Sequence, residues 1–226
     1  MASRAASFDD RSTTILEAAI AMADAEGVDV VTLRSIAVRT GLSQATVHRD
    51  FSSRDRLVAS MAQRIFSSHM RPPAQTGDAV VTLCRLAEQE WGAYGTHPWL
   101  VNVMASTRPP LVPAVLDAAR ATIEVFLELG LDDEAALDRY LALNAYIQGM
   151  GLLLIAEHRE SARSGSSYHA WWSQEIRRLD RSGSTLRRPW ISQLADQPRA
   201  DGFDANACFR ASLHRVISGL VGSGPR

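Results

Sequence analysis

The sequence predicts an all-α protein. Along most of its 226 residues, apolar side chains recur at spacings of three and four, which is the period of an amphipathic helix. Glycine, proline and small polar residues stand between these periodic segments, where helices begin and end. No segment sustains the alternation of apolar and polar residues that a half-buried strand requires.

The composition is that of an ordinary globular chain. Hydrophobic residues make up 46% and charged residues 22% of it, which excludes a fully disordered protein. The net charge is −1, so any surface for nucleic acid must be local. All 24 basic residues are arginines, and this excludes chemistry that depends on lysine, such as a Schiff base or a P-loop.

The sequence also predicts a cytoplasmic protein without a membrane segment. Cys84 and Cys208 are too few for a disulfide framework or a cysteine-rich zinc site. Residues 1–11 are polar and charged, unlike a signal peptide. The longest apolar region, 141–156, is interrupted by polar residues and is too short to span a bilayer.

Four helices are expected before residue 70. The first covers residues 12–26, and the first and second end at glycines, Gly27 and Gly41. Each begins at a hydroxyl residue that can cap a helix N-terminus: Ser12, Thr32, Ser43, and Ser52 or Ser53. A loop at 71–78 follows, and it predicts two domains, residues 10–70 and 78–222.

The second domain is expected to be a helical bundle. Its helical patterns cover residues 79–94, 98–105, 111–129, 134–159, 167–179 and 204–220. Prolines stand at the starts of these segments or between them, where a helix tolerates them. The stretch 180–203 is expected to be a long loop.

A helix-turn-helix pattern lies in the first domain, because a Thr-Gly-Leu turn at 40–42 joins the second helix to the third. Its small core is supplied by Leu33, Ile36, Leu42, Val47 and Phe51. Ala45, His48 and Arg49 share the opposite face of the third helix, with Gln44 and Thr46 beside them. Ala45 is small enough to let the helix approach base edges, and its polar neighbours suit readout of the major groove.

Local charge supports DNA binding. Residues 34–64 hold six Arg and two Asp, a net charge of +4 within a chain of net charge −1. An Arg-rich face by itself is more often a solvated surface of a small helical subdomain. The turn, the caps and the spacing together favour a DNA-binding domain.

Three segments resemble the DNA-binding domain of the TetR family of bacterial repressors: Ile-Leu-Glu-Ala-Ala at 15–19, Thr-Leu-Arg-Ser-Ile-Ala at 32–37, and residues 41–57. The resemblance implies DNA contacts from the third helix and its cap: Ser43, Gln44, Thr46, His48 and Arg49. It implies phosphate contacts from Thr32, Arg34 and Arg54. His48 stands where the family usually has Tyr, and Asp50, where Tyr or His is common, should repel phosphate unless it pairs with Arg54.

The second domain resembles that of the tetracycline repressor in four segments: residues 97–100, 107–110, 126–130 and 146–149. The two positions associated there with the metal of the bound drug are Met104 and Leu153 in this chain, so a magnesium–tetracycline complex is not expected. An aromatic-rich region nonetheless suits a small-molecule pocket. The candidate ligand contacts are Trp99, Met104, Arg108 and Tyr146, and the alternative for each is a place in the core.

A homodimer is also expected. The helix at 134–159 is apolar nearly all round and should be buried on every side. The resemblance implies that it forms a four-helix interface with the helix at 204–220 and their two-fold mates. Three tryptophans, Trp171, Trp172 and Trp190, are left open as core, dimer contact or pocket lid.

The sequence therefore predicts a ligand-responsive transcriptional repressor. A homodimer would bind a pseudo-palindromic operator in double-stranded DNA until a small molecule releases it. The alternative is an all-α carrier or enzyme whose helix-turn-helix is only structural, but no catalytic constellation supports an enzyme. No metal or cofactor is expected, since His-x-x-x-His and dinucleotide motifs do not occur. An activator would use the same DNA contacts.

Overall fold

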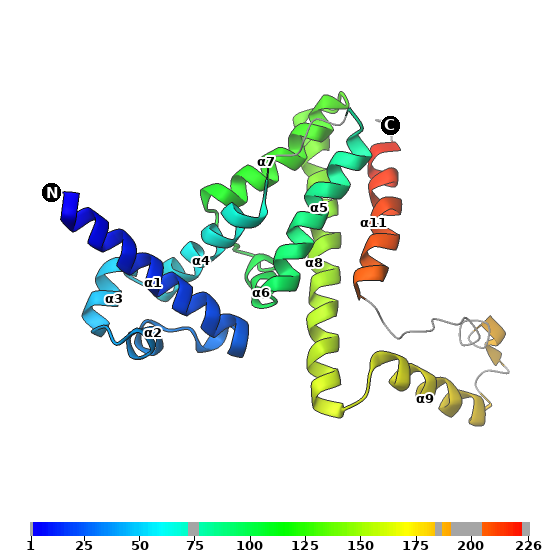
Figure 1. The fold of residues 1–226 in the computed structure, drawn as a ribbon. Helices are drawn as coiled ribbons and strands as arrows, with labels where there is room; N and C mark the ends of the chain where they lie inside the picture. Colours follow the sequence, from blue (N-terminus) through cyan, green and yellow to red (C-terminus); the bar gives the residue numbers. More distant parts are fainter. Residues whose placement is uncertain (1, 72–76, 184–186, 191–204, 223–226) are drawn as a thin grey trace. The chain divides into compact units, whose positions relative to one another are not determined.

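The regular secondary structure of the chain is helical. The computed structural model describes residues 2–71, 77–183, 187–190 and 205–222, and within them it contains no strand, which confirms the all-α prediction. The first helices are α1 (Ala2–Glu26), η1 (Val28–Val30), α2 (Leu33–Thr40), α3 (Gln44–Phe51) and α4 (Arg54–His69). The others are α5 (Ala79–Thr96), α6 (Trp99–Met104), α7 (Pro113–Glu128), α8 (Asp133–Ser164), α9 (Tyr168–Arg181) and α11 (Ala205–Gly222) (Figure 1).

The predicted start of the first helix is wrong. Ser12 was expected to cap it, but α1 begins at Ala2 and Ser12 lies inside the helix. The residues before Ser12 include several alanines, the residue with the highest helix propensity, so the helix has no reason to start later. The added turns place Arg11 where it can reach α3.

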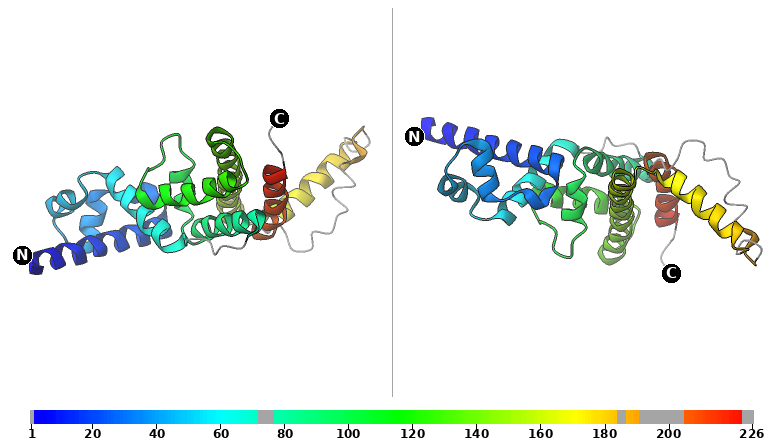
Figure 2. Two further views of the ribbon diagram at one scale, coloured as in Figure 1. Left: turned by 90° about the horizontal axis from the view of Figure 1, so that it is seen from above. Right: turned by 90° about the horizontal axis from the view of Figure 1, so that it is seen from below.

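The chain divides into two compact units, Met1–Gly151 with Val216–Arg226, and Leu152–Arg215. In the first unit α1 packs against α2 and α4, and α4 packs in turn against α5 and α7 (Figures 1 and 2). The loop at 71–78, predicted to separate two domains, therefore lies within this unit. Helix α4 is the element shared by the helix-turn-helix and the helices that follow it.

The core beneath the helix-turn-helix is fully buried. Its members with no exposed surface are Ile15, Ala19, Val31, Ile36, Val47, Leu57 and Met61. They come from α1, the segment before α2, and helices α2, α3 and α4. Burial of this many aliphatic side chains fixes the orientation of α3 relative to α1 and α4.

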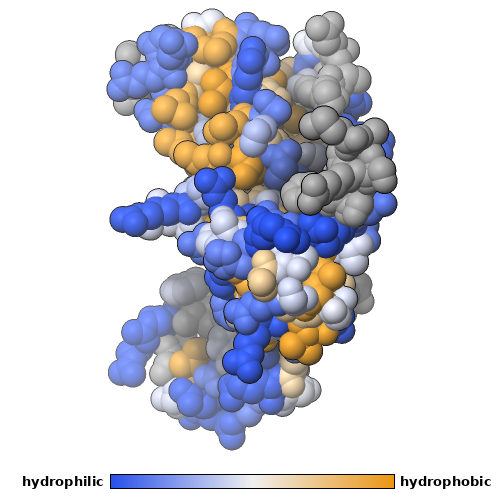
Figure 3. Space-filling view, turned by 90° about the vertical axis from the view of Figure 1, so that its left-hand side faces the viewer, coloured by the Kyte–Doolittle hydropathy of each residue, from blue (hydrophilic) through white to orange (hydrophobic). Residues whose placement is uncertain are grey.

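The sequence of α8 suggested a helix buried on every side, but in the single chain one face of this helix is exposed. Leu143 and Ile147 are buried, but Leu137 and Leu141 are about half exposed. These two leucines are four residues apart and so lie on one face of α8. On the face that Figure 3 views, apolar patches lie between hydrophilic areas, and the figure labels no residue among them. Within the single chain, α8 therefore carries an exposed apolar face beside its buried one.

Gly151 explains how α8 approaches α6. A Cβ atom at this position would lie 2.9 Å from Cγ2 of Val101, closer than packed carbon atoms allow. At Gly149, two residues earlier on α8, a Cβ would meet nothing within 4 Å in the described part of the chain.

In the second unit, the rings of Tyr168, Trp171 and Trp172 form a cluster at the start of α9. The ring centroids of Tyr168 and Trp171 are 5.6 Å apart, and the ring of Tyr168 stacks on that of Trp172. Trp171 and Trp190 are both about half exposed, so neither belongs to a core of the single chain. Most of the predicted loop at 180–203 lies outside the described residues.

Candidate DNA-binding surface and ligand cavity

Two capped helices, α2 and α3, flank the turn of the helix-turn-helix. The hydroxyl of Thr32 accepts from the backbone N–H of Ser35, and the hydroxyl of Ser35 accepts in return from the N–H of Thr32, which is a capping box. Gly41 ends α2 with φ 68°, a left-handed conformation that other residues rarely adopt. The side chain of Ser43 then caps α3 by accepting from the N–H of Thr46 at 3.1 Å.

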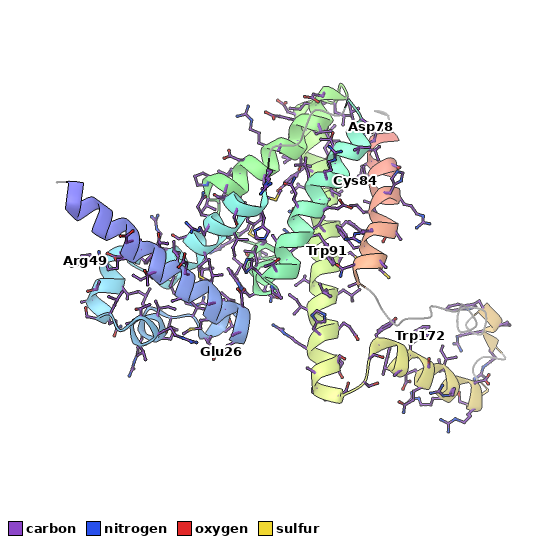
Figure 4. All side chains as sticks on the ribbon, in the orientation of Figure 1. Glu26, Arg49, Asp78, Cys84, Trp91 and Trp172 are labelled. Carbon is purple, nitrogen blue, oxygen red and sulfur yellow. The ribbon has the colours of Figure 1, made fainter. Side chains whose placement is uncertain are left out.

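Helix α3 has one buried face and one exposed face. Val47 and Phe51 are buried. On the other side Gln44, Ala45, His48 and Arg49 are all exposed. Figure 4 labels Arg49 on this helix. The side chains predicted to contact bases therefore share one open surface, which we call the α3 face (Gln44, Ala45, His48 and Arg49).

The remaining predicted DNA contacts differ in what surrounds them. Arg34 is exposed at the start of α2. The hydroxyls of Ser43 and Thr46 lie 2.8 Å apart and bond to each other. The guanidinium of Arg54 donates to the backbone carbonyls of Val31 and Val28, at 2.9 and 2.8 Å. Arg54 thus ties α4 to the segment that leads into α2, a structural role that the sequence did not suggest.

Asp50 pairs with Arg11 and not with Arg54. Nε and one terminal nitrogen of Arg11 donate to the two carboxylate oxygens of Asp50, at 2.7 and 3.0 Å. The side chain of Asp50 has no exposed surface, so its charge is not presented on the α3 face. The hydrogen bond from Arg11 to Asp50 raises the pKa of the guanidinium. The pair links α1 to α3, because the two residues lie 39 positions apart.

We expect Arg11→Met to lower the melting temperature by several degrees. The substitution leaves the Asp50 carboxylate covered and without its bidentate partner, which is costlier than losing an exposed pair. Arg39→Met is the matched control, since Arg39 pairs with Glu26 at 3.5 Å with both side chains about half exposed. Thermal unfolding followed by circular dichroism measures both variants. Equal melting temperatures for the two would contradict this role of Arg11.

A small cavity lies between helices α4 to α8. Its volume is about 30 Å³, enough for about one or two water molecules. Phe66 of α4 and Met70, which ends that helix, line it together with Met104 of α6. An open groove of about 420 Å³ shares Phe66, Met70, Leu86 and Ala118 with the cavity. These four side chains therefore separate the cavity from the outside.

Polar groups gather at one wall of this cavity. Glu90 of α5 and Tyr140 and Asn144 of α8 line it, and the hydroxyl of Tyr94 donates to Glu90 at 2.5 Å. Burial raises the pKa of Glu90 to about 7, and the hydrogen bond from Tyr94 opposes this shift only in part. Burial, strengthened by the nearby Glu90, also raises the pKa of Tyr94 well above its ordinary value.

Of the four residues predicted to contact a ligand, Met104 alone lines this cavity. Trp99 is buried, and its indole N–H donates to Asp24 at 2.8 Å. Arg108 is exposed in the turn after α6, and Tyr146 is half-buried on α8. The structure does not bring these four side chains together around one space.

Asp24 ties the end of α1 to the start of α6. One of its carboxylate oxygens accepts from Trp99, and the ring of His97 lies within hydrogen-bond distance of the same oxygen, at 2.9 Å. Helix α6 also carries Met104, which lines the cavity. A helix of six residues thus connects the cavity wall to α1 of the helix-turn-helix.

We expect Asp24→Ala to lower the free energy of unfolding by about 1–3 kcal/mol, since it leaves the buried indole N–H of Trp99 without an acceptor. In a Trp99→Phe background, where that donor is gone, the same substitution should cost clearly less. Urea unfolding of the four proteins of this double-mutant cycle measures the difference. An equal cost of Asp24→Ala in both backgrounds would show that the bond to Trp99 contributes nothing.

Sequence reasoning missed Glu90, Asp24 and Arg11. For Glu90 a signal existed, because it falls seven residues after Leu83 and four before Tyr94, on the buried face of α5. An acid on such a face needs an explanation. Asp24 and Arg11 gave no comparable signal, because their partners are distant in sequence.

The described residues hold no group of three or more His, Cys, Asp and Glu side chains that can bind a metal ion. None of the described helices combines the length and apolar character needed to cross a membrane.

The helix-turn-helix is capped and exposes the polar α3 face, and α4 leads from it to the cavity. These features define a DNA-binding regulator with a helical C-terminal region. Comparison with known families agrees. Residues 15–61 match the model of bacterial regulatory proteins of the tetR family, and residues 71–222 match the tetracyclin repressor-like C-terminal domain. The chain belongs to the TetR family of transcriptional regulators, as its sequence predicted.

The individual proteins that resemble this chain share about a quarter of its residues or fewer. The chain is 26% identical over 211 residues to the HTH-type transcriptional repressor DrrR1 of Streptomyces coeruleorubidus, covering 91% of this chain and 75% of that one. Its fold is similar to that of ActR from Streptomyces coelicolor in complex with actinorhodin, with a TM-score of 0.77, 21% identity and coverage of 94% and 96%. It is also similar to TetR from Acinetobacter baumannii in complex with minocycline, with a TM-score of 0.61, 18% identity and coverage of 92% and 94%.

Proposed function

We propose that this regulator is a homodimeric repressor that holds operator DNA until a small molecule occupies the cavity between α4 and α8. One observation carries the proposal: α4 belongs to both sites. Near its N-terminus Arg54 and Leu57 hold the helix-turn-helix. At its other end Phe66 and Met70 line the cavity.

The small size of the cavity supports a coupled movement. At about 30 Å³ it is too small for an organic effector, so binding must push its walls apart. Phe66 and Met70 form the wall on α4, and the backbone N–H of Ala114 on α7 donates to Gln63 of α4 at 2.9 Å. A displacement of the end of α4 moves α3 with it, because Arg54 and Leu57 bind α4 to the helix-turn-helix. Effector and operator then oppose each other's binding.

The division of roles follows the predicted domains. We assign DNA binding to residues 10–70, and effector binding and dimerisation to residues 78–222. The α3 face is assigned to base contacts together with Ser43 and Thr46, and Thr32, Arg34 and Arg54 to the phosphate backbone. Trp99, Met104, Arg108 and Tyr146 stay as proposed effector contacts, and Met104 is the one of them that lines the cavity described above.

A dimer supports operator specificity, because one short recognition helix reads too few base pairs. The exposed Leu137 and Leu141 on α8 offer an apolar face of the kind that two-fold interfaces bury. A symmetric dimer pairs with a pseudo-palindromic operator. The protein then acts in the cytoplasm, where the DNA lies.

The relatives support this assignment. The curated relative is a transcriptional repressor, and two proteins of similar fold are seen with actinorhodin and minocycline. Both ligands are organic molecules much larger than the cavity of about 30 Å³ between α4 and α8. We therefore infer an organic effector and repression in its absence.

The test is fluorescence anisotropy with DNA that flanks the coding region of this protein, at two salt concentrations. A repressor binds this DNA more tightly than a random duplex, and its affinity falls steeply with salt as phosphate contacts release counterions. If the flanking DNA gives no preference, selection from a random duplex library supplies the operator. A carrier or enzyme with a merely structural helix-turn-helix selects no sequence at all.

A further inference from the structure

Glu90 is unusual among the residues that line the cavity. It is the single carboxylate of that wall, and no arginine or histidine lines the cavity beside it. Most of its neighbours are apolar, such as Phe66, Leu86 and Ile147. A carboxyl group so placed is costly unless something in the cavity uses it.

The polar neighbours of Glu90 are neutral. The hydroxyl of Tyr94 donates to it at 2.5 Å. The Tyr140 phenol and the Asn144 amide line the same cavity, and Gln148 donates to the amide oxygen of Asn144 at 3.2 Å. Tyr94 and Tyr140 stay neutral near pH 7, because burial raises the pKa of Tyr94 well above its ordinary value and that of Tyr140 to about 12. No other titratable side chain from α4, α6 or α7 lines the cavity.

Glu90 keeps part of its surface accessible, although it lies deep among the helices. Its side chain lines the cavity, so an effector that pushes the cavity walls apart meets the carboxyl group there. A positive charge placed there would pair with the carboxylate in surroundings of low polarity, where such pairs are strong. An anionic effector would meet repulsion at the same wall.

We propose that the effector carries a protonated amine on an apolar body, and that Glu90 is the counter-ion that selects it. This inference rests on the proposed function, because it concerns the same cavity. Glu90 is the one acidic residue among those that line the cavity, so we expect a single ammonium group on the effector. The apolar body occupies the space opened as Phe66 and Met70 move. A neutral effector that bonds to Glu90 through a hydroxyl is the alternative outcome of the test.

Two probes of equal shape separate these outcomes: 2-naphthylmethylamine and 2-naphthylmethanol. They differ only in the ammonium or hydroxyl group that would meet Glu90. Isothermal titration of each into the full-length protein should show the amine binding about tenfold more tightly, the difference between a charged and a neutral hydrogen bond. The preference should grow between about pH 6 and pH 8 as Glu90 loses its proton.

Glu90→Gln keeps the shape of the side chain and removes its charge. In this variant the preference for the amine should disappear, while the alcohol still binds. The double variant Glu90→Gln/Asn144→Asp returns a carboxylate to the same cavity wall, where Gln148 can still donate to it. It should recover part of the amine preference, and a retained helical circular dichroism spectrum shows that each variant is folded.

Equal affinities for the two probes, or no binding of either at its solubility limit, would overturn the assignment of an amine. Tighter binding of the alcohol would indicate that the effector is neutral and not an amine. Failure of the proposed function shows separately, in the wild-type protein, as the absence of sequence-selective and salt-dependent DNA binding. The two failures can therefore be told apart.

Discussion

Replacing both His48 and Arg49 by alanine is expected to weaken operator binding by at least about a hundredfold. Both side chains are exposed on the α3 face and face away from the core. A good contact with a base edge contributes about 1–3 kcal/mol to discrimination, and each substitution acts twice in a symmetric dimer. Fluorescence anisotropy with operator DNA measures the loss, and circular dichroism checks that α3 still folds.

Arg39→Ala is the control for the double variant. Arg39 is exposed on α2 and pairs with Glu26, so its substitution removes the same charge away from the α3 face. We expect a much smaller loss of affinity for this variant. Wild-type affinity in the double variant would show that α3 is not the recognition helix.

Glu90→Gln is expected to make the protein more stable at about pH 8, by about 3 kcal/mol. The pKa of Glu90 is raised from its ordinary value to about 7 in the folded chain, so between these values the folded state holds a proton that the unfolded state has released. The contribution of the protonated Glu90 to the free energy of unfolding is fully present below the pKa that Glu90 has in the unfolded chain. It is lost as the pH rises through about 7. Glutamine cannot ionise and should remove this loss.

Urea unfolding from about pH 4 to pH 8 checks this prediction. Tyr94→Phe is the matched variant, since the hydrogen bond from Tyr94 holds the pKa of Glu90 lower than burial alone would. Its loss should move the pH-dependent decline to higher pH. If wild type and Glu90→Gln change in parallel over the whole range, Glu90 does not titrate with a raised pKa.

Local signals in the sequence predicted most of the helices. Thr32, Ser43 and Ser53 cap the helices expected of them, and Gly41 ends α2, because a cap depends on residues three or four positions away. The exposed α3 face followed from the helical period, since Val47 and Phe51 fix which side is buried. These features need no knowledge of the rest of the chain.

The tertiary partners could not be predicted in the same way. Asp50 was expected to repel phosphate unless it paired with Arg54, four residues on; its partner is Arg11, on a helix that starts earlier than Ser12 suggested. Trp99 was considered as a ligand contact, yet its indole bonds to Asp24, 75 positions away. Sequence spacing shows which residues share a helix face but not which helix packs against it.

The exposure of α8 has a related cause. Leu137 and Leu141 belong to a helix whose apolar character predicted burial on every side, but the single chain leaves them half exposed. The sequence predicted that the apolar side chains of this helix are buried. It does not show whether the same chain or a second copy of it buries them. We assign this face to the proposed dimer.

In the proposed function, filling the cavity releases the operator, and a cavity-filling variant tests this coupling without a ligand. Ala119 of α7 lines the cavity, and Ala121 of the same helix lines only the outer groove. The measurement is the operator affinity of Ala119→Phe by fluorescence anisotropy, with Ala121→Phe as the control and circular dichroism to confirm folding. We predict that Ala119→Phe loses at least about tenfold in affinity while Ala121→Phe binds like the wild type. Wild-type affinity in a folded Ala119→Phe protein would contradict the coupling between cavity and operator.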